Sequence, residues 1–194
     1  MVRIGITGGI GTGKSTVCRI LKCMQIPVYE ADAKARELME SQPDLIRSIR
    51  ELFGSEAYLD NHLLNRAHLA ETVFKAPTQL EKLNRLVHPA VHDDFRKWCQ
   101  RHETKHAVVA KEAALMLEEG KPDDLDYVLA VVCPDEKRIE RIMKRDPHRS
   151  HSQIRNIICR QLPQNKMQQL ADFTVVNDDA QPVIEPLLDI LKKI

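Results

Sequence analysis

The stretch "GITGGIGTGKSTV", residues 5–17, decides how the chain folds. Five of the seven glycines of the protein fall within it, four of them between positions 8 and 13. This density is typical of backbone with unusual dihedral angles or with a close approach to another group. Residues 8–15 fit G-x-x-x-x-G-K-[ST], a pattern whose backbone amides surround phosphate oxygens. The stretch therefore predicts a phosphate-binding loop.

The segments on either side of the loop supply the context that this pattern requires. "VRIGIT" before it contains β-branched residues and predicts a buried strand, and residues 14–24 after it have the apolar spacing of a helix. Lys14 is expected to neutralise charge between the β- and γ-phosphates of a nucleotide, and the Ser15 hydroxyl to bind Mg²⁺. The residues expected to hold the nucleotide are Gly9, Gly11, Thr12, Gly13, Lys14, Ser15 and Thr16.

The rest of the chain alternates buried-strand patterns with helical ones. This alternation favours a three-layer α/β fold with a mostly parallel sheet, and with the loop it predicts the P-loop NTPase fold. We expect a single domain over residues 1–194, with a helical insertion at 43–101 and a small lid at 145–163. The strands predicted after the first one cover residues 26–29, 106–115, 127–133 and 173–176.

The composition excludes several classes of protein. With 43% hydrophobic residues in a chain of 194, a full core can be buried, so a disordered protein is excluded. The 29 basic and 28 acidic residues leave a net charge of +1, which gives no overall field to attract nucleic acid or a membrane surface. Five cysteines without a C-x-x-C pair predict reduced thiols, and we recognise no leader or membrane span, so we expect a cytoplasmic protein. The oligomeric state stays open, and a monomer is compatible with the sequence.

Two acidic residues follow predicted strands and are candidates for phosphoryl transfer. Asp32 comes after the second strand, at the sheet edge where such folds bind ligands, and could orient and deprotonate an acceptor hydroxyl. An equal alternative is that Asp32 caps the helix that begins with "AKAREL". Glu112 ends the third strand and suits Mg²⁺ binding through water, unless it forms a surface pair with Lys111.

A basic helix precedes Pro147, and most of its cations are expected to lie on a solvated face. Arg145 and Arg149 differ because they lie where the proline ends the helix. A mobile lid at this point could carry an arginine, in the first place Arg145, over the γ-phosphate and exclude water. The cations of this stretch are Lys137, Arg138, Arg141, Lys144, Arg145 and Arg149.

His88 and His92 have the i, i+4 spacing that occurs in zinc sites. No glutamate of the H-E-x-x-H pattern lies between them, and Pro89 is expected to begin a helix that leaves His88 outside it. We therefore expect no metal at this pair.

Four separated motifs together resemble the dephospho-CoA kinase family, and the resemblance runs nearly from end to end. They are "GITGGIGTGKST", "IPVYEADAKAREL", "LNRLVHP" and "RQLPQNKMQQLADFTVVND". The last of them matches the family pattern at Gln161, Pro163, Lys166, Ala171, Asp172 and Asn177.

The resemblance implies a reaction and roles for several residues. The reaction is transfer of a phosphoryl group from ATP, with Mg²⁺, to the ribose 3′-hydroxyl of dephospho-CoA, which gives coenzyme A and ADP in the last step of coenzyme A synthesis. The resemblance assigns the base to Asp32, and it places Arg36, His88 and Glu112 on the side of this small-molecule substrate. It further implies that the helical insertion forms a coenzyme-A-side domain and that Arg145 belongs to a lid.

The chain departs from the family pattern at several positions. Asn65 stands where an acidic residue is usual, and Ile157 replaces a common arginine. In the segment that begins at Glu112, Ala114 and Leu117 replace a proline and a phenylalanine. The departures concern individual contacts and leave the phosphate loop and the proposed base in place.

Two other functions stay open from the residues alone. The loop also serves other small-metabolite and nucleoside kinases, which differ in the acceptor that they phosphorylate. It serves nucleotide switches as well, in which the bound nucleotide sets the affinity for a partner. "QNKMQQ" lacks the guanine-specifying Asn-Lys-x-Asp pattern, which argues against a GTPase but leaves an ATP-dependent switch open.

Overall fold

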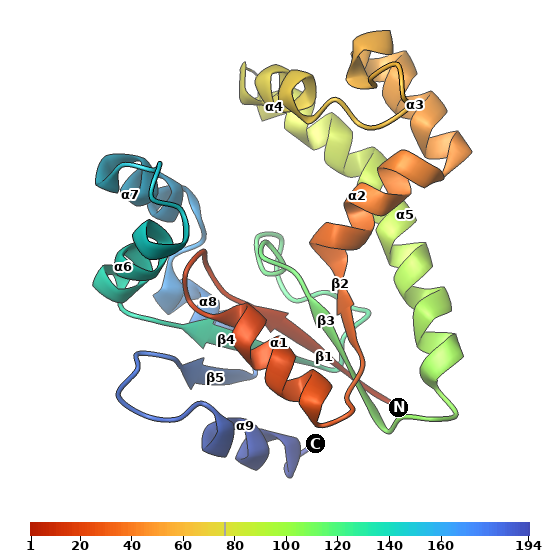
Figure 1. Cartoon of the computed structure of the whole chain (residues 1–194). Coiled ribbons are helices and arrows are strands. Elements are labelled where there is room, and N and C mark those ends of the chain that lie inside the picture. The colour runs from red at the N-terminus through yellow and green to blue at the C-terminus, as the bar shows by residue number, and fades with distance from the viewer. Residues whose placement is uncertain (76) are drawn as a thin grey trace. The chain divides into compact units, whose positions relative to one another are not determined.

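The computed structural model describes residues 1–75 and 77–194. These residues form two compact units, one comprising Met1–Glu30 with His102–Ile194 and the other Ala31–Arg101. The first unit contains the sheet, and the second contains helices and the loops that connect them (Figure 1).

Five parallel strands form the sheet of the first unit, in the spatial order β2-β3-β1-β4-β5. This sheet confirms the predicted α/β class. The third predicted strand, 106–115, is too long because the chain turns away from the sheet after Glu112, and the second strand lies slightly later than expected. The bounds are β1 Val2–Thr7, β2 Val28–Glu30, β3 Val108–Glu112, β4 Tyr127–Val132 and β5 Phe173–Val176.

The strand register brings the ends of β1, β3 and β4 to one edge of the sheet. Ile6 of β1 pairs with Glu112 of β3, and Thr7 pairs with Ala130 of β4. From β1 the chain first runs to β2 on one side and later to β4 and β5 on the other, so its direction reverses at β1. Open α/β sheets bind ligands at such a reversal, outside the carboxyl ends of the strands. The loop after β1 therefore lies at the expected binding position.

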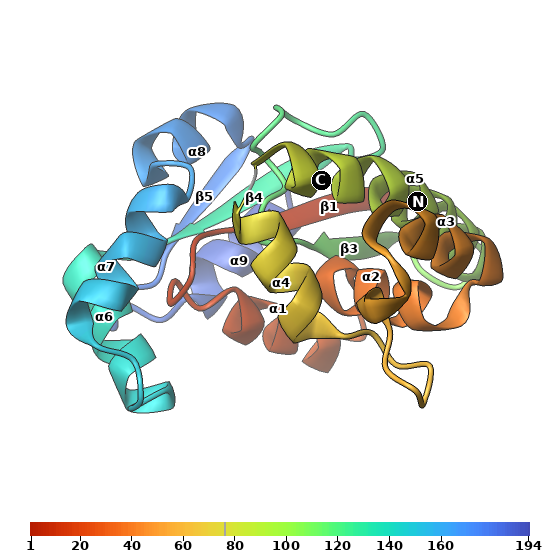
Figure 2. The ribbon, with the colours of Figure 1, turned by 90° about the horizontal axis from the view of Figure 1, so that it is seen from above.

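Two helices, α1 (Lys14–Cys23) and α9 (Ile184–Leu191), cover one face of the sheet (Figure 2). Cys18 of α1 belongs to the core that they form with the strands. Its burial, together with the charges of Glu112 and Glu30, raises the pKa of the thiol to about 12, so the thiol is protonated at neutral pH. The buried residues of this core are Ile4, Ile6, Val17, Cys18, Leu21, Ala110, Leu129, Val131, Val175, Val183, Leu187 and Ile190.

The segment 113–126 covers the opposite face of β1, and α8 (Gln164–Leu170) lies on that side of the sheet (Figure 2). An added Cβ at Gly5 would collide with Met116 and lie 2.7 Å from Leu125, which shows how closely this segment packs. The sequence pattern does not predict α8, because "QNKMQQL" has too few apolar residues to display a helical period. Among its residues only Met167 is buried.

The helices α6 (Asp135–Arg145) and α7 (His151–Arg160) pack against each other next to the loop after β1. Ser150 and Gln153 have the sequence spacing of a capping box, and α7 begins with one: the Gln153 N–H donates to the Ser150 hydroxyl, and the Ser150 N–H donates to the Gln153 side chain. Their small apolar core comprises Ile139, Ile142 and Ile154, with Ile10 of the loop packed against it.

The second unit consists of helices, and two of them have caps that their sequence explains. Gly54, with a positive φ of 84°, ends α3, and Oδ1 of Asn65 accepts a hydrogen bond from the His68 N–H at 3.2 Å at the start of α4. Tyr58 donates from its hydroxyl to the Met39 carbonyl at 2.7 Å, and burial raises the pKa of Tyr58 to about 12. The elements are α2 Ala31–Ser41, α3 Pro43–Phe53, the short 3-10 helix Ser55–Ala57, α4 Arg66–Lys75 and α5 Pro77–His102, whose last residue falls in the first unit.

The course of α5 corrects one prediction. Pro89 lies inside this helix of 26 residues and does not begin it, so His88 is part of the helix. A proline removes the N–H that would bond to the Arg85 carbonyl and its ring crowds that carbonyl, but the turns on either side continue the helix. The side chains of His88 and His92 are exposed, and within residues 1–75 and 77–194 no group of three or more His, Cys, Asp or Glu could hold a metal ion.

All five cysteines are free thiols, as the sequence predicts. Cys18, Cys99 and Cys133 are buried, and Cys23 and Cys159 are exposed. Within the described ranges, no helix has both the length and the apolar character needed to span a membrane.

Asp172, directly before β5, links the start of that strand to β4 and to the segment before β4. Its Oδ2 accepts hydrogen bonds from the Val128 N–H at 2.7 Å and from the Lys121 ammonium at 2.8 Å. Burial alone would raise the pKa of this carboxyl, but the hydrogen bonds from Lys121 and Val128 outweigh it, so the pKa lies below the ordinary value of 3.8.

Asp172→Asn is expected to lower the melting temperature at neutral pH by about 2–4 °C, which corresponds to about 1 kcal/mol in a chain of this size. Because the pKa is lower in the folded state than in the unfolded state, the charged carboxylate stabilises the fold above pH 3.8, and this contribution disappears as the pH falls through the folded pKa. Thermal unfolding by circular dichroism, from neutral pH to below pH 3.8, measures the difference. Asp189→Asn, at an exposed pair with Lys192, is the control. A difference from wild type that does not shrink in acid would contradict the role of the charge.

Candidate active site

The loop between β1 and α1 has a backbone that glycine adopts readily. Gly11 and Gly13 have φ angles of 79° and 94°, in the region where other residues are strained. At Gly13 an added Cβ would also collide with the side chain of Asn177. The density of glycines in the sequence thus reflects the geometry of this turn.

Several amides of the loop fit the phosphates of a nucleotide. The N–H groups of Gly11, Gly13 and Ser15 donate to no acceptor within the described residues. They lie just before α1 and in its first turn, at the positive end of the helix dipole. Unpaired amides in this position bind phosphate oxygens. Ser15 is exposed in the same turn, and its hydroxyl is an oxygen donor of the kind that Mg²⁺ prefers.

The Lys14 ammonium lies against the loop, and the end of β3 brings a carboxylate close to it. Nζ of Lys14 donates to the Gly8 carbonyl at 2.7 Å and lies 3.9 Å from Oε1 of Glu112. Lys111 forms an ion pair with Asp124 at 2.8 Å. Glu112 therefore lies beside the lysine of the loop.

The carbonyl groups of the loop are bound by protein donors. Asn177, directly after β5, donates from Nδ2 to the Thr12 carbonyl at 2.8 Å. Arg141 of α6 donates from Nη1 to the carbonyls of Gly11 and Thr12, both at 3.4 Å, and from Nη2 to Asp179 at 2.5 Å. The loop therefore has its carbonyls satisfied by the protein while amides remain unpaired, and this polarity suits an anion.

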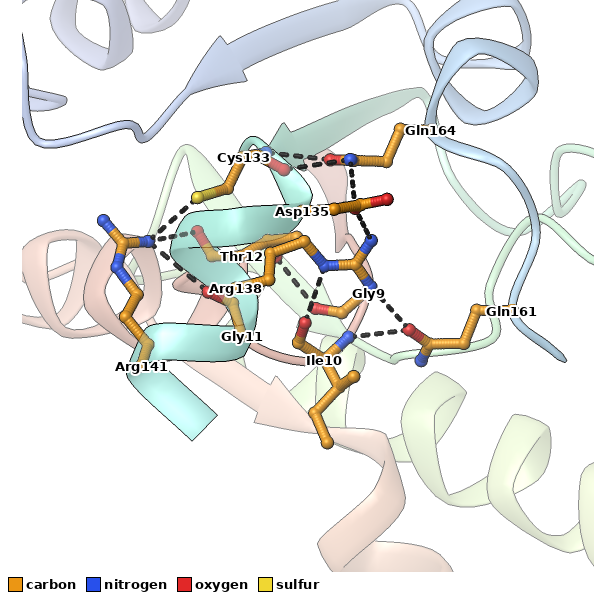
Figure 3. A network of polar contacts seen from close by, with 10 residues as sticks. All are labelled: Gly9, Ile10, Gly11, Thr12, Cys133, Asp135, Arg138, Arg141, Gln161 and Gln164. Carbon is orange, nitrogen blue, oxygen red and sulfur yellow. Dashed lines mark hydrogen bonds and ion pairs between the residues drawn. The ribbon is translucent and has the colours of Figure 1, made fainter. Parts of the chain in front are cut away.

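Arg138, only 3% exposed, joins α6 to the loop (Figure 3). Its Nε donates to the Ile10 carbonyl and its Nη2 to Oε1 of Gln161, both at 2.9 Å, and its Nη1 donates to Asp135 at 2.8 Å. Oε1 of Gln161 also accepts the Ile10 N–H at 2.9 Å. Two side chains from distant parts of the sequence thus bind both polar groups of one loop residue.

The solvated face that the sequence predicts for the basic helix does not hold for Arg138 and holds only in part for Arg141. Arg138 is buried, and Arg141 exposes about a quarter of its side chain. One signal is present in the sequence, because Arg138 stands four residues before Ile142 and so shares a helix face with it. That spacing does not reveal the partners of Arg138, because Ile10 and Gln161 come from other parts of the chain.

Cys133 follows β4 at the edge of the same network (Figure 3). Its N–H donates to Oε1 of Gln164 at 2.8 Å and its carbonyl accepts from Nε2 at 2.9 Å, so the first residue of α8 is fixed to the end of β4. Burial raises the pKa of the Cys133 thiol, and the guanidinium of Arg141 at 3.4 Å offsets this only in part. The thiol is therefore protonated at neutral pH.

Asp32, Arg36 and His88, which the sequence assigns to the acceptor, lie in the second unit. α2 begins at Ala31, so Asp32 lies inside the first turn of the helix and not at the cap position. Its carboxylate is exposed and has no hydrogen-bond partner among the residues that the structure describes, while its carbonyl accepts a bond from Nε of Arg36 at 3.0 Å. His88 is exposed on α5.

Arg145 is the last residue of α6, where the helix ends before Pro147. It is exposed, and its guanidinium has no ion-pair partner in the part of the chain that the structure describes. Arg149 pairs with Asp146. Of the two arginines considered for a lid, Arg145 is the one that no carboxylate binds.

The chain is similar to known proteins over nearly its whole length. The sequence profile of the family described as dephospho-CoA kinase matches residues 2–182. A dephospho-CoA kinase from Chlorobium luteolum is 38% identical over 180 residues, which cover 90% of this chain and 82% of that protein. A crystal structure from Thermus thermophilus has a TM-score of 0.83 at 31% identity and covers 99% of this chain and 95% of its own. A dephospho-CoA kinase from Campylobacter jejuni shares the fold, with a TM-score of 0.71 at 21% identity and coverage of 98% and 96%.

Proposed function

The chain belongs to the dephospho-CoA kinase family, and from this premise we propose that its loop binds ATP with Mg²⁺ for transfer to the ribose 3′-hydroxyl of dephospho-CoA. As a member, it is a phosphotransferase with a nucleotide donor and a small-molecule alcohol as acceptor. The observation that carries the assignment of the donor site is the set of unpaired amides at Gly11, Gly13 and Ser15 beside Lys14.

The loop would position the donor phosphates through its own groups. Lys14, which now donates to the Gly8 carbonyl, would exchange this bond for oxygens of the β- and γ-phosphates. Mg²⁺, when bound, would neutralise charge on the same phosphates, held by the Ser15 hydroxyl directly and by Glu112 through water. The remaining nucleotide contacts come from Gly9, Gly11, Thr12, Gly13 and Thr16.

The acceptor proton is assigned to Asp32. β2 ends at Glu30, so the chain reaches Asp32 two residues after the carboxyl edge of the sheet. Its exposed and unpaired carboxylate can accept the proton of a hydroxyl group. Arg36 and His88 would bind the acceptor substrate. Arg145 would cover the transferring phosphoryl group, where a guanidinium stabilises negative charge and helps to exclude water.

The cytoplasm is the compartment that fits this chain, because all five of its cysteines are free thiols. Neither alternative function gains support from the site. A kinase for a different small-metabolite acceptor would need groups that bind that acceptor. A switch would need no proton acceptor, so it would not explain the unpaired carboxylate of Asp32, which follows β2.

ADP release from ATP and Mg²⁺ is expected only when dephospho-CoA is present, with coenzyme A as the second product. Parallel reactions contain AMP, uridine, shikimate, gluconate or no acceptor, and one reaction contains EDTA to remove the metal. A rate with another acceptor alone would contradict dephospho-CoA as the substrate. Nucleotide binding without any acceptor-dependent rate would favour a switch, and an unchanged rate in EDTA would contradict the role of Mg²⁺.

A further inference from the structure

Side chains, and not the backbone, hold both polar groups of Ile10 (Figure 3). Its N–H donates to Oε1 of Gln161 and its carbonyl accepts from Nε of Arg138, each at 2.9 Å. The two side chains also bond to each other, from Nη2 of Arg138 to the same Oε1, at 2.9 Å. The three residues thus form a closed ring of hydrogen bonds, in which the position of each depends on the other two.

Gly9 is matched to this pair of side chains. Its φ is not positive, so its backbone conformation is open to other residues. An added Cβ at Gly9 would nevertheless collide with Nη2 of Arg138 and lie 2.8 Å from Oε1 of Gln161. Close approach of these two head groups, and not a dihedral angle, therefore opposes a side chain at Gly9.

The same pair connects the loop to α6 and α7. Arg138 is buried within α6, where Asp135 binds its remaining terminal nitrogen, Nη1, at 2.8 Å. Gln161 directly follows α7 as its C-cap residue. The backbone of α6 also lies against the loop, because an added Cβ at Gly11 would be 2.8 Å from the Arg138 carbonyl. The conformation of the loop therefore depends on where these two helices lie.

From this geometry we propose that Arg138 and Gln161 are positioning residues for the nucleotide. They hold the peptide groups of Ile10 so that the amides of Gly11 and Gly13 face the phosphates. This inference rests on the proposed nucleotide site and extends it to two residues outside the loop. A displacement of about 1 Å in such an arrangement can cost about 10²-fold in rate.

Gln161 offers a matched pair of substitutions. Gln161→Glu keeps the acceptor for both Ile10 and Arg138, and it sacrifices no observed bond because Nε2 has no acceptor among the described residues. Gln161→Leu removes the acceptor at similar size. We expect Gln161→Leu to raise the Kd and KM for ATP by about 10-fold or more, and Gln161→Glu to stay within about 3-fold of wild type.

Arg138→Met is expected to raise the same constants by about 10-fold or more. The double variant should lose clearly less than the product of the two single effects, because both side chains act on one peptide. Arg19→Met, at an exposed position of α1, is the control and should change neither constant.

Titration calorimetry with ATP gives the Kd, and steady-state kinetics and thermal unfolding give KM, kcat and the melting temperature. If the wild type binds no ATP, the proposed function is wrong, and the inference falls with it. If the wild type binds ATP and the variants bind it equally well, with only lower melting temperatures, the pair is purely structural and the inference is wrong. The inference would also be wrong if the effects of the two single substitutions on the Kd for ATP multiplied in the double variant. It would be wrong as well if Gln161→Glu bound ATP as weakly as Gln161→Leu.

Discussion

Lys14→Met should reduce kcat by about 10²- to 10³-fold, the range for loss of one preorganised group that stabilises transition-state charge. Methionine keeps an unbranched apolar stem but removes the charge and the donors of Nζ. The unpaired amides of Gly11, Gly13 and Ser15 stay in place, so the affinity for ATP should fall much less than turnover. The comparison needs kcat from ADP release with dephospho-CoA as acceptor, and the Kd for ATP from titration calorimetry.

Lys22→Met is the matched control for this experiment. Lys22 lies in the last turn of the same helix and pairs with Glu30, so its substitution also removes one lysine charge from α1. We expect turnover within about 2-fold of wild type, as for ordinary surface substitutions. A Lys14→Met protein that keeps more than about a tenth of wild-type turnover would contradict the role given to Lys14.

Asp32→Asn should spare ATP binding and cut turnover by about 10²-fold or more, the usual scale for loss of a general base. The amide has nearly the same shape as the carboxylate, but it cannot accept the proton of the acceptor hydroxyl. The carboxylate has no hydrogen-bond partner in the described part of the chain, so the substitution breaks no observed contact. Single-turnover measurements with dephospho-CoA isolate the chemical step.

Asp44→Asn distinguishes a catalytic role from a helical one. Asp44 is an exposed acidic residue in the first turn of α3, as Asp32 is in the first turn of α2. If Asp32 only stabilises its helix, both variants should show nearly normal turnover and a small loss of stability. If Asp32 is the base, only its own variant should lose turnover.

The phosphate loop could be predicted from the sequence because its parts are consecutive. Its amides, Lys14 and Ser15 come from one short stretch, and the strand before it and the helix after it have strong local patterns. The approach of Glu112 to Lys14 could be expected too, since parallel strands end at a common edge. These features depend on local geometry and on one general property of parallel sheets.

The contacts of Arg138 could not be predicted in this way, because they depend on how α6, α7 and the loop pack together. A run of charged residues is most often solvated, and nothing in the local pattern sets Arg138 apart as a partner of Ile10 and Gln161. The continuity of α5 through Pro89 has a similar cause, because local sequence indicates a break that the helix as a whole tolerates. The polar helix α8 is fixed by tertiary bonds such as those of Gln164 to Cys133.

The space around Gly9 has a consequence for how this sequence can evolve. Because a side chain at Gly9 would occupy the volume of the Arg138 and Gln161 head groups, these three positions are not free to change independently. A larger residue at Gly9 requires the head groups of Arg138 and Gln161 to shift or to be replaced by smaller ones. Substitutions at these three positions, although far apart in the chain, should therefore covary among related sequences. The residues accepted at one position depend on those present at the other two.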